Sequence, residues 1–382
     1  MSSLRKLLLL LAIGATTVIS CNKTKSPDKP LPKIYKPSVL VGCDNNMFYS
    51  LDAQTGSKNW EFQTDGGVES SACLYKNVAY FGSNGGKFYA VNANTGKLLW
   101  VKQLNAPIKS SACIGNDKIY FGSDNDTLYC LDLNGNDIWK YDMEGAIICS
   151  PLYYDNKIFC GSRKAALFKC LNATTGGFIW KQPNFGGGSY AFLSSPCRVD
   201  TIVVYGYDGD FLLNSRFSDG NPVIASYTTG FEVFGGITSS PISYGGMILF
   251  GGNDNIVHCR NTVDGAKRWE YHTGDKIYSS PCIDELSETV FVGSYDFNLY
   301  AINFVDGKLR WKYPAGSIIK SSPVVFNNII YFSCLDKYVY AVNIQSGSLL
   351  WKRNIDATSM SSPVVDDLKD GIHPGISGMS KY

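Results

Sequence analysis

The stretch AVNANTGKLLW at residues 90–100 returns as AINFVDGKLRW at 301–311 and as AVNIQSGSLLW at 341–351. In each copy an alanine is followed two residues later by an asparagine, and the stretch closes on a glycine and a tryptophan. The turn LDAQTG at residues 51–56 is built in the same way. A segment that recurs across a chain of 382 residues predicts a repeat architecture.

Every tryptophan of the chain lies at the same place in this repeat. The fifth unit alone lacks one, and Asn221-Pro222-Val223 stands near the expected position. The seven residues are Trp60, Trp100, Trp139, Trp180, Trp269, Trp311 and Trp351. Their spacing predicts eight units of about 40 residues.

A serine and a glycine mark two further places in each unit. The serine precedes a proline or an alanine and recurs at intervals of 40, 39, 45, 45, 40, 42 and 40 residues, at Ser71, Ser111, Ser150, Ser195, Ser240, Ser280, Ser322 and Ser362. The glycine follows an aromatic or aliphatic pair at Gly42, Gly82, Gly122, Gly161, Gly206, Gly251 and Gly293, with Ser333 in the eighth place. Both 45-residue intervals fall in units four and five.

Residues 107–142 show the content of one unit. Their pattern predicts strands over 108–114, 118–122, 127–131 and 137–141, and turns rich in Asn, Asp and Gly separate them. No segment of useful length has the helical period. Four antiparallel strands in about 40 residues are typical of a propeller blade. The expected fold is therefore all-β, a single eight-bladed β-propeller.

The two ends of the repeat region complement each other. Residues 39–42 match the second strand of a unit with no first strand before them, whereas residues 361–365 match a first strand with nothing after it. We expect the two segments to pair and to close the ring, which removes an open sheet edge. The propeller is then predicted over residues 38–366, followed by a C-terminal tail over 367–382.

The charge of the chain excludes one class of partner. Lys and Arg number 35 and Asp and Glu number 33, and removing residues 1–20, which hold Arg5 and Lys6 and no acid, leaves 33 of each. Binding to nucleic acid needs a basic footprint, which a balanced chain lacks.

Residues 1–20 are predicted to be a signal peptide. Arg5 and Lys6 form a short basic region, and the apolar run over 7–18 is too short for a membrane helix. The sequence Val18-Ile19-Ser20-Cys21 resembles a bacterial lipoprotein box, which implies cleavage before Cys21 and attachment of lipid to its thiol.

Residues 21–37 are predicted to be a flexible tether. Five lysines and four prolines lie in residues 22–37, a composition that favours an extended segment. By resemblance to enterobacterial sorting, Asn22 after Cys21 implies the outer membrane, and the lack of a following acidic run favours its periplasmic face. We expect the membrane to be reached by the lipid anchor only.

The repeated segments resemble the pyrroloquinoline quinone (PQQ) type of propeller repeat. The resemblance covers nearly all of residues 38–366 and implies that the tryptophans dock between blades, against alanine and glycine. The family includes quinoprotein alcohol and sugar dehydrogenases. It also includes non-catalytic lipoproteins, such as the propeller scaffold of the outer-membrane barrel-assembly machinery, so the repeat does not choose a function.

The sequence lacks a feature that a dehydrogenase of this family often carries. The resemblance implies Ca²⁺ held by acidic and amide oxygens, an Asp base and often an adjacent Cys-Cys pair, and no such pair occurs. The acids that accompany Asn, as in Asp124-Asn125-Asp126 and Asp208-Gly209-Asp210, fall at turn positions. We therefore expect no catalytic residue, no metal and no cofactor, with PQQ and Ca²⁺ as the alternative.

The cysteines are expected to be buried thiols, with Cys21 reserved for lipid. Seven occupy repeated strand positions, and no Cys-x-x-Cys motif indicates zinc. They are Cys73, Cys113, Cys197 and Cys282 after the repeat serine, and Cys130, Cys170 and Cys259 in the place of Ala90. Only burial is predicted for Cys43, Cys149, Cys160 and Cys334. His258 takes a place held by tyrosine in other units, which predicts packing.

Two sets of residues are candidates for a binding surface. If the serine-bearing strand is innermost, residues two before each serine line the mouth of the axis, among them Glu69, Lys109, Tyr278 and Lys320. The extensions of units four and five place aromatic residues beside glycines, at Phe185, Tyr190, Phe192, Phe231 and Phe234. The alternative for these extensions is local repacking around the missing tryptophan.

These features favour a monomeric, non-catalytic propeller that acts as a protein-interaction scaffold in the cell envelope, with a role in outer-membrane protein assembly. One alternative is a propeller that binds carbohydrate or another small ligand. The other is a PQQ-dependent oxidoreductase.

Overall fold

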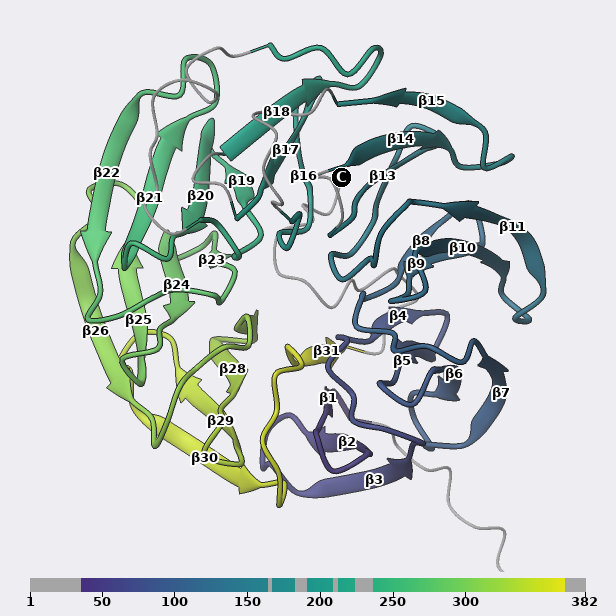
Figure 1. Cartoon of the computed structure of the whole chain (residues 1–382). Coiled ribbons are helices and arrows are strands. Elements are labelled where there is room, and N and C mark those ends of the chain that lie inside the picture. The colour runs from purple at the N-terminus through teal and green to yellow at the C-terminus, as the bar shows by residue number, and fades with distance from the viewer. Residues whose placement is uncertain (1–35, 164–166, 183–190, 209–211, 224–235, 368–382) are drawn as a thin grey trace, which may run out of the picture. The chain divides into compact units, whose positions relative to one another are not determined.

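Eight sheets stand around a ring in the computed structural model, which describes residues 36–163, 167–182, 191–208, 212–223 and 236–367 (Figure 1). Seven of the sheets have four antiparallel strands and one has three, and no helix occurs in these residues. Each sheet is one blade, numbered here in chain order. The predicted all-β, eight-bladed propeller is confirmed.

The strands of each blade run from the axis to the rim in one order. In blades 1 to 4 they are β31 (Val364–Asp366), β1 (Ser38–Gly42), β2 (Met47–Asp52) and β3 (Lys58–Gln63); β4 (Cys73–Tyr75), β5 (Val78–Gly82), β6 (Lys87–Asn92) and β7 (Leu98–Gln103); β8 (Cys113–Gly115), β9 (Lys118–Gly122), β10 (Thr127–Asp132) and β11 (Asp137–Asp142); β12 (Leu152–Tyr154), β13 (Lys157–Gly161), β14 (Phe168–Asn172) and β15 (Phe178–Lys181).

In blades 5 to 8 they are β16 (Cys197–Val199), β17 (Ile202–Gly206) and β18 (Leu212–Arg216); β19 (Ile242–Tyr244), β20 (Met247–Gly251), β21 (Ile256–Asn261) and β22 (Lys267–His272); β23 (Cys282–Asp284), β24 (Thr289–Gly293), β25 (Asn298–Asn303) and β26 (Leu309–Pro314); β27 (Val324–Phe326), β28 (Ile329–Ser333), β29 (Tyr338–Asn343) and β30 (Leu349–Asn354). Blade 5, the unit without tryptophan, is the sheet with three described strands.

The first strand of blade 3 is shorter than the sequence predicts. In blade 3 the expected strand over 108–114 is reduced to β8, whereas the other three strands lie within one residue of the prediction. The backbone N–H of Ile108 instead donates to the Ser83 carbonyl of blade 2 (3.0 Å), and that of Ser111 to the Ser150 hydroxyl of blade 4 (3.2 Å). N–H groups that are bonded to other blades cannot extend the ladder within their own blade.

The repeat serines form a closed circle of hydrogen bonds around the axis. The N–H of each serine donates to the hydroxyl of the next one at 2.8–3.2 Å, and Ser362 donates to Ser71 (3.1 Å). The serine-bearing segments are therefore innermost, as Figure 1 also shows. Each bond crosses from one blade to the next, which fixes the height of neighbouring blades along the axis.

The preceding serine ties the first strand of a blade to the second. The Ser70 hydroxyl donates to the Gly82 carbonyl (2.9 Å) and accepts from the Gly82 N–H (3.0 Å). Ser239 and Gly251 repeat this pair of bonds in blade 6. A Cβ at Gly82 would lie 2.2 Å from the Ile108 side chain, so the repeated glycine is required by close packing between blades.

The chain closes the ring with its two ends. β31 pairs antiparallel with β1, with Val365 opposite Val39, and the yellow β31 lies beside the purple β1 in Figure 1. The first and last strands start and end at the predicted limits, Ser38 and Asp366. When the ring is closed in this way, the axial edge of β1 in blade 1 is paired by β31.

Truncation after Ser359 removes β31 and two bonds of the serine circle. Since Val364 and Val365 are buried, we expect the free energy of unfolding to fall by about 3–6 kcal/mol. Thermal melts followed by circular dichroism measure the loss. Truncation after Asp367 is the matched control because it leaves β31 in place. Equal melting temperatures for the two truncations would contradict the assigned closure.

Candidate binding face around the axis

Eight residues, each two positions before a repeat serine, form a ring at one end of the axis, called here the mouth ring. All eight are half-buried. They are Glu69, Lys109, Ile148, Leu193, Thr238, Tyr278, Lys320 and Met360. The hairpins between the second and third strands surround the ring on the same face. The four candidates predicted for the mouth are members of this ring.

Most polar members of the mouth ring bind the hairpin of their own blade. Asn84 donates to Glu69 (2.7 Å), Lys109 forms an ion pair with Asp124 (3.1 Å), and Thr238 donates to Asn253 (3.4 Å). The acidic side chains are therefore each bonded within their own blade and do not converge on a common point. No group of three or more His, Cys, Asp or Glu side chains among the described residues is arranged to hold a metal ion.

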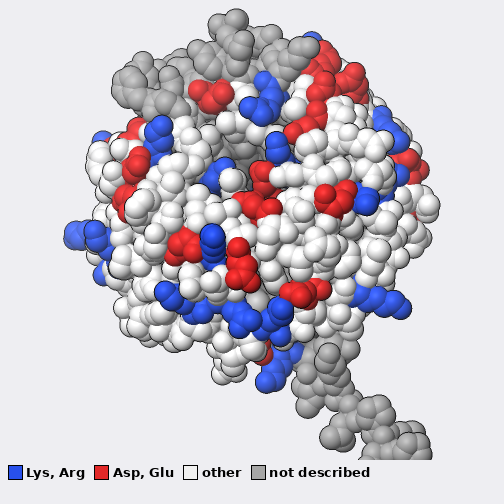
Figure 2. Space-filling model, turned by 60° about the horizontal axis from the view of Figure 1, so that its bottom comes forward, with Lys and Arg blue, Asp and Glu red and all other residues white. Residues whose placement is uncertain are grey.

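The face in Figure 2 carries basic and acidic side chains interspersed among uncharged ones. This distribution agrees with the balanced charge of residues 21–382.

The structure describes only one of the aromatic candidates of units four and five. Phe185, Tyr190, Phe231 and Phe234 lie outside the described residues. Phe192 is 2 % exposed, and its ring lies 5.7 Å from Phe168 and 5.5 Å from Tyr205. The prediction of Phe192 as a surface residue is wrong, because it takes the place of the buried Ile108 and packs against Gly161. A column-by-column comparison of the repeats would have found this.

Each tryptophan reaches into the next blade. The indole N–H of Trp60 donates to the Ala93 carbonyl (2.9 Å), and its ring lies against Gly96, where a Cβ would come within 2.8 Å. The same bond recurs at 2.7–3.1 Å for the other tryptophans. Trp351 of blade 8 donates to Ala53 of blade 1, so the docking continues across the closure.

The tryptophan-receiving surface of blade 6 carries two polar residues where that of blade 2 is apolar. In blade 2 this surface holds Tyr89 and Val91, which pack with Trp60. His258 and Arg260 stand in their places, 3 % and 4 % exposed. Because blade 5 has no tryptophan to insert, the two deviations from the repeat lie in one interface. The sequence signal was the arginine in a column that is aliphatic in six of the other seven blades.

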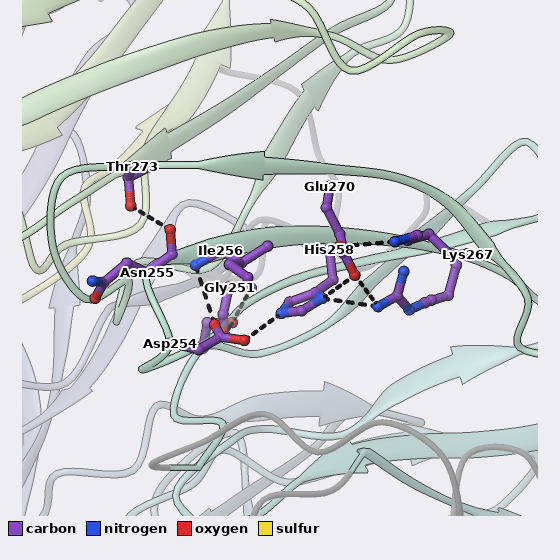
Figure 3. A network of polar contacts seen from close by, with 10 residues as sticks. Gly251, Asp254, Asn255, Ile256, His258, Lys267, Glu270 and Thr273 are labelled. Carbon is purple, nitrogen blue, oxygen red and sulfur yellow. Dashed lines mark hydrogen bonds and ion pairs between the residues drawn. The ribbon is translucent and has the colours of Figure 1, made fainter.

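The polar residues of blade 6 form a connected network across β21 and β22 (Figure 3). His258 lies between Asp254 and Glu270, with Nε2 3.0 Å from the Asp254 carboxylate. Arg260 donates to Glu270 and to His258 Nδ1 (3.1 Å). Because a guanidinium only donates, His258 accepts at Nδ1 and carries its proton at Nε2. His258 also stacks on Phe250, so the predicted packing role holds alongside a polar one.

Glu270 is the anionic centre of this network. Burial by itself would raise its pKa, but the hydrogen bond and the charge of Arg260, followed by the hydrogen bond from Lys267, lower the pKa to about 2. The ordinary pKa of a glutamate is about 4.3. The ionised form is therefore stabilised by folding, and this contribution is present above pH 4.3 and is lost as the pH falls towards 2.

The cysteines of the described residues are buried thiols, as predicted. Burial raises the pKa of Cys73, Cys130 and Cys170 to about 12, which disfavours the thiolate. Cys149 takes the place of the serine that clamps the first two strands, and its thiol donates to the Gly161 carbonyl (3.3 Å). It therefore keeps the bond of the serine it replaces.

Comparison with known proteins gives one family and one fold. The family model of the outer membrane protein assembly factor BamB matches residues 22–114, 102–223 and 168–370. None of the curated proteins matches the chain. No helix of the described residues is long and apolar enough to cross a membrane.

Solved propellers resemble the structure at low identity. BamB from Moraxella catarrhalis is 21 % identical, with a TM-score of 0.61 over 77 % of this chain and 88 % of that one. AztD from Citrobacter koseri is 14 % identical, with a TM-score of 0.66 over 87 % of this chain and 98 % of that one. Quinohemoprotein alcohol dehydrogenase from Comamonas testosteroni is 13 % identical, with a TM-score of 0.64 over 78 % of this chain and 70 % of that one. At these identities the likeness concerns the fold alone.

Adjacent glycines in blade 4 test the docking of tryptophan. Gly176 has φ +72° and lies against Trp139, whereas a Cβ at Gly177 meets only the Thr175 hydroxyl at 3.2 Å. We expect Gly176→Ala to lower the free energy of unfolding by about 2–4 kcal/mol, through backbone strain and overpacking, and Gly177→Ala to change it by less than about 1 kcal/mol. Urea unfolding measures both. Equal effects would contradict the docking argument.

Glu270→Gln tests the network of blade 6. At pH 7 we expect a loss of about 1–3 kcal/mol of unfolding free energy, because the buried Arg260 loses its carboxylate partner. The difference from the parent chain should shrink as the pH falls from 4.3 towards 2. Glu61→Gln is the matched control, since Glu61 holds the same place in blade 1 but pairs at the surface with Lys58. A pH-independent difference for Glu270→Gln would refute the assignment.

Proposed function

Since the chain belongs to the family of the outer membrane protein assembly factor BamB, we propose that it is a non-catalytic scaffold of the cell envelope, with a role in outer-membrane protein assembly. The family match, which spans residues 22–370 in overlapping segments, carries this proposal. A rigid ring of eight blades suits such a role because it holds many connections in fixed positions at its two ends.

The chain enters the propeller at the end opposite the mouth. The Pro37 carbonyl accepts the N–H of Ala53, which follows β2 at the end of the blade opposite the mouth. With lipid on Cys21, a tether of residues 22–37 spans at most about 55 Å. We propose that this anchor holds the chain at the periplasmic side of the outer membrane.

The mouth is the proposed contact face. Its half-buried side chains include charges, aromatic rings and aliphatic groups, a mixture that is typical of protein interfaces. Carbohydrate binding is the competing use of such a face. The proposed role uses no cofactor.

Site-specific photo-crosslinking in intact envelopes tests the scaffold role. A photoreactive phenylalanine at Lys109 or Thr238 reports on the mouth, and one at Lys97 or Asn328 reports on the opposite face. We expect protein adducts from the mouth positions, identified by mass spectrometry. Adducts only from the opposite face, or only with glycan, would contradict the proposal. Addition of PQQ and Ca²⁺ should give neither a new visible band nor dye reduction.

A further inference from the structure

Two cysteines of blade 4 occupy repeat positions that hold other residues in every other blade. Cys149 takes the place of the serine that clamps the first two strands, and all the other blades keep that serine, as Ser70 does in blade 2. Cys160 precedes Gly161 in β13, at a place that is aromatic in five blades and valine in the other two. Blade 4 therefore departs from the repeat at two positions, and both departures are to cysteine.

The two thiols meet at one carbonyl group. Cys149 Sγ donates to the Gly161 carbonyl oxygen at 3.3 Å, and Cys160 Sγ lies 3.6 Å from the same oxygen. Both side chains are 1 % exposed, and both belong to the core between blades 3 and 4, together with Ile147 and Ile158. The two departures from the repeat are therefore in contact with a single atom inside the core.

The thiols also hydrogen-bond to each other, and this bond makes them unequal. The bond from Cys160 is the largest influence on Cys149 and lowers its pKa, although burial acts in the opposite direction. The same bond, followed by burial, raises the pKa of Cys160 well above its ordinary value. The pKa of every other described cysteine is raised as well. Cys149 is thus the described cysteine on which a thiolate, the attacking form of the group, is favoured.

We propose that Cys149 and Cys160 form a disulfide with each other when the chain folds in the presence of a disulfide oxidant. The Cys149 thiolate attacks the oxidant, a mixed disulfide forms, and one thiol of the oxidant leaves. Cys160 then attacks the Cys149 sulfur, and the second thiol of the oxidant leaves. The two cysteines lose two electrons, the oxidant is reduced to two thiols, and the two cysteine protons end on those thiols.

The burial of both thiols places this reaction before the packing of blade 4 on blade 3, since the finished core shields them from an oxidant. The two cysteines are close in sequence and lie in one blade, so their contact does not wait for closure of the ring. Export, which residues 1–21 predict, would expose the folding chain to such oxidants. The product joins the segment of the repeat serine Ser150 to β13 and replaces the clamping hydrogen bond by a covalent one.

Refolding of the full chain from urea with reduced and oxidised glutathione tests the proposal. The remaining thiols are then labelled with N-ethylmaleimide in urea, and we expect two fewer labels than on a chain refolded under reducing conditions. Trypsin cleaves after Lys140, Lys157 and Arg163, so the two cysteines fall in separate peptides, 141–157 and 158–163. Mass spectrometry should find these two peptides joined.

The substitution Cys149→Ser separates the disulfide from the fold, because it restores the residue of the other blades. We expect this variant to lose no labels and to melt at one temperature with and without the oxidant, and Cys160→Val, the residue of blades 1 and 7, to do the same. The parent chain should melt about 5 °C higher when oxidised, since the cross-link constrains the unfolded chain. Cys113→Ser is the matched control: Cys113 lies in the same core, and this variant should still lose two labels.

Three outcomes would overturn the proposal. One is an oxidised chain that carries as many labels as the reduced chain. Another is a joined pair of peptides that holds Cys113 or Cys130, which lie in the same core, in place of Cys149. The third is an oxidised parent chain that melts below the reduced one, because the native fold would then not accommodate the bond.

Discussion

A circle of eight hydrogen bonds, each from the backbone N–H of one repeat serine to the hydroxyl of the next, joins the innermost segments of the blades. The other strands of each blade and the mouth ring are positioned relative to this circle. The serine before each repeat serine holds the second strand, and the mouth ring lies two residues before it. Because the bonds run in one direction and return to Ser71, the blades are locked at equal heights. A side chain at the mouth therefore has a fixed position, which a binding face needs.

The rim is held by a second set of contacts that is complete except in blade 5. Seven indoles dock on the left-handed glycine of the following blade, and Trp351 docks on blade 1. Where blade 5 offers no indole, blade 6 presents His258 and Arg260 in place of tyrosine and an aliphatic residue. The missing tryptophan of blade 5 and the ionic network of blade 6 are thus two features of the same interface between blades. Charges taken out of water are tolerated only when they are paired, which explains why Glu270 accompanies Arg260.

The sequence was most informative where one residue type has one geometric role. Tryptophan, the repeat serine and the turn glycines gave the number of blades, three of the four strands in a blade and the closure by residues 361–365. The first strand was overestimated, because its N–H groups bond to other blades. Phe192 was misplaced for a related reason: its position follows an extension of the repeat, and only the packing against Gly161 shows that it fills a core position.

The sequence by itself determined an eight-bladed propeller with balanced charge and buried thiols, because its composition sets the charge and because most repeated residues make the same local contact in each blade. The tertiary structure alone decided which charges meet. Asp254, His258, Arg260 and Glu270 become a network because the antiparallel register of β21 and β22 sets His258 opposite Glu270 and brings Arg260 within reach of both. Whether a charge is neutralised depends on distances of a few ångströms between side chains, and the spacing of residues along the chain does not contain those distances.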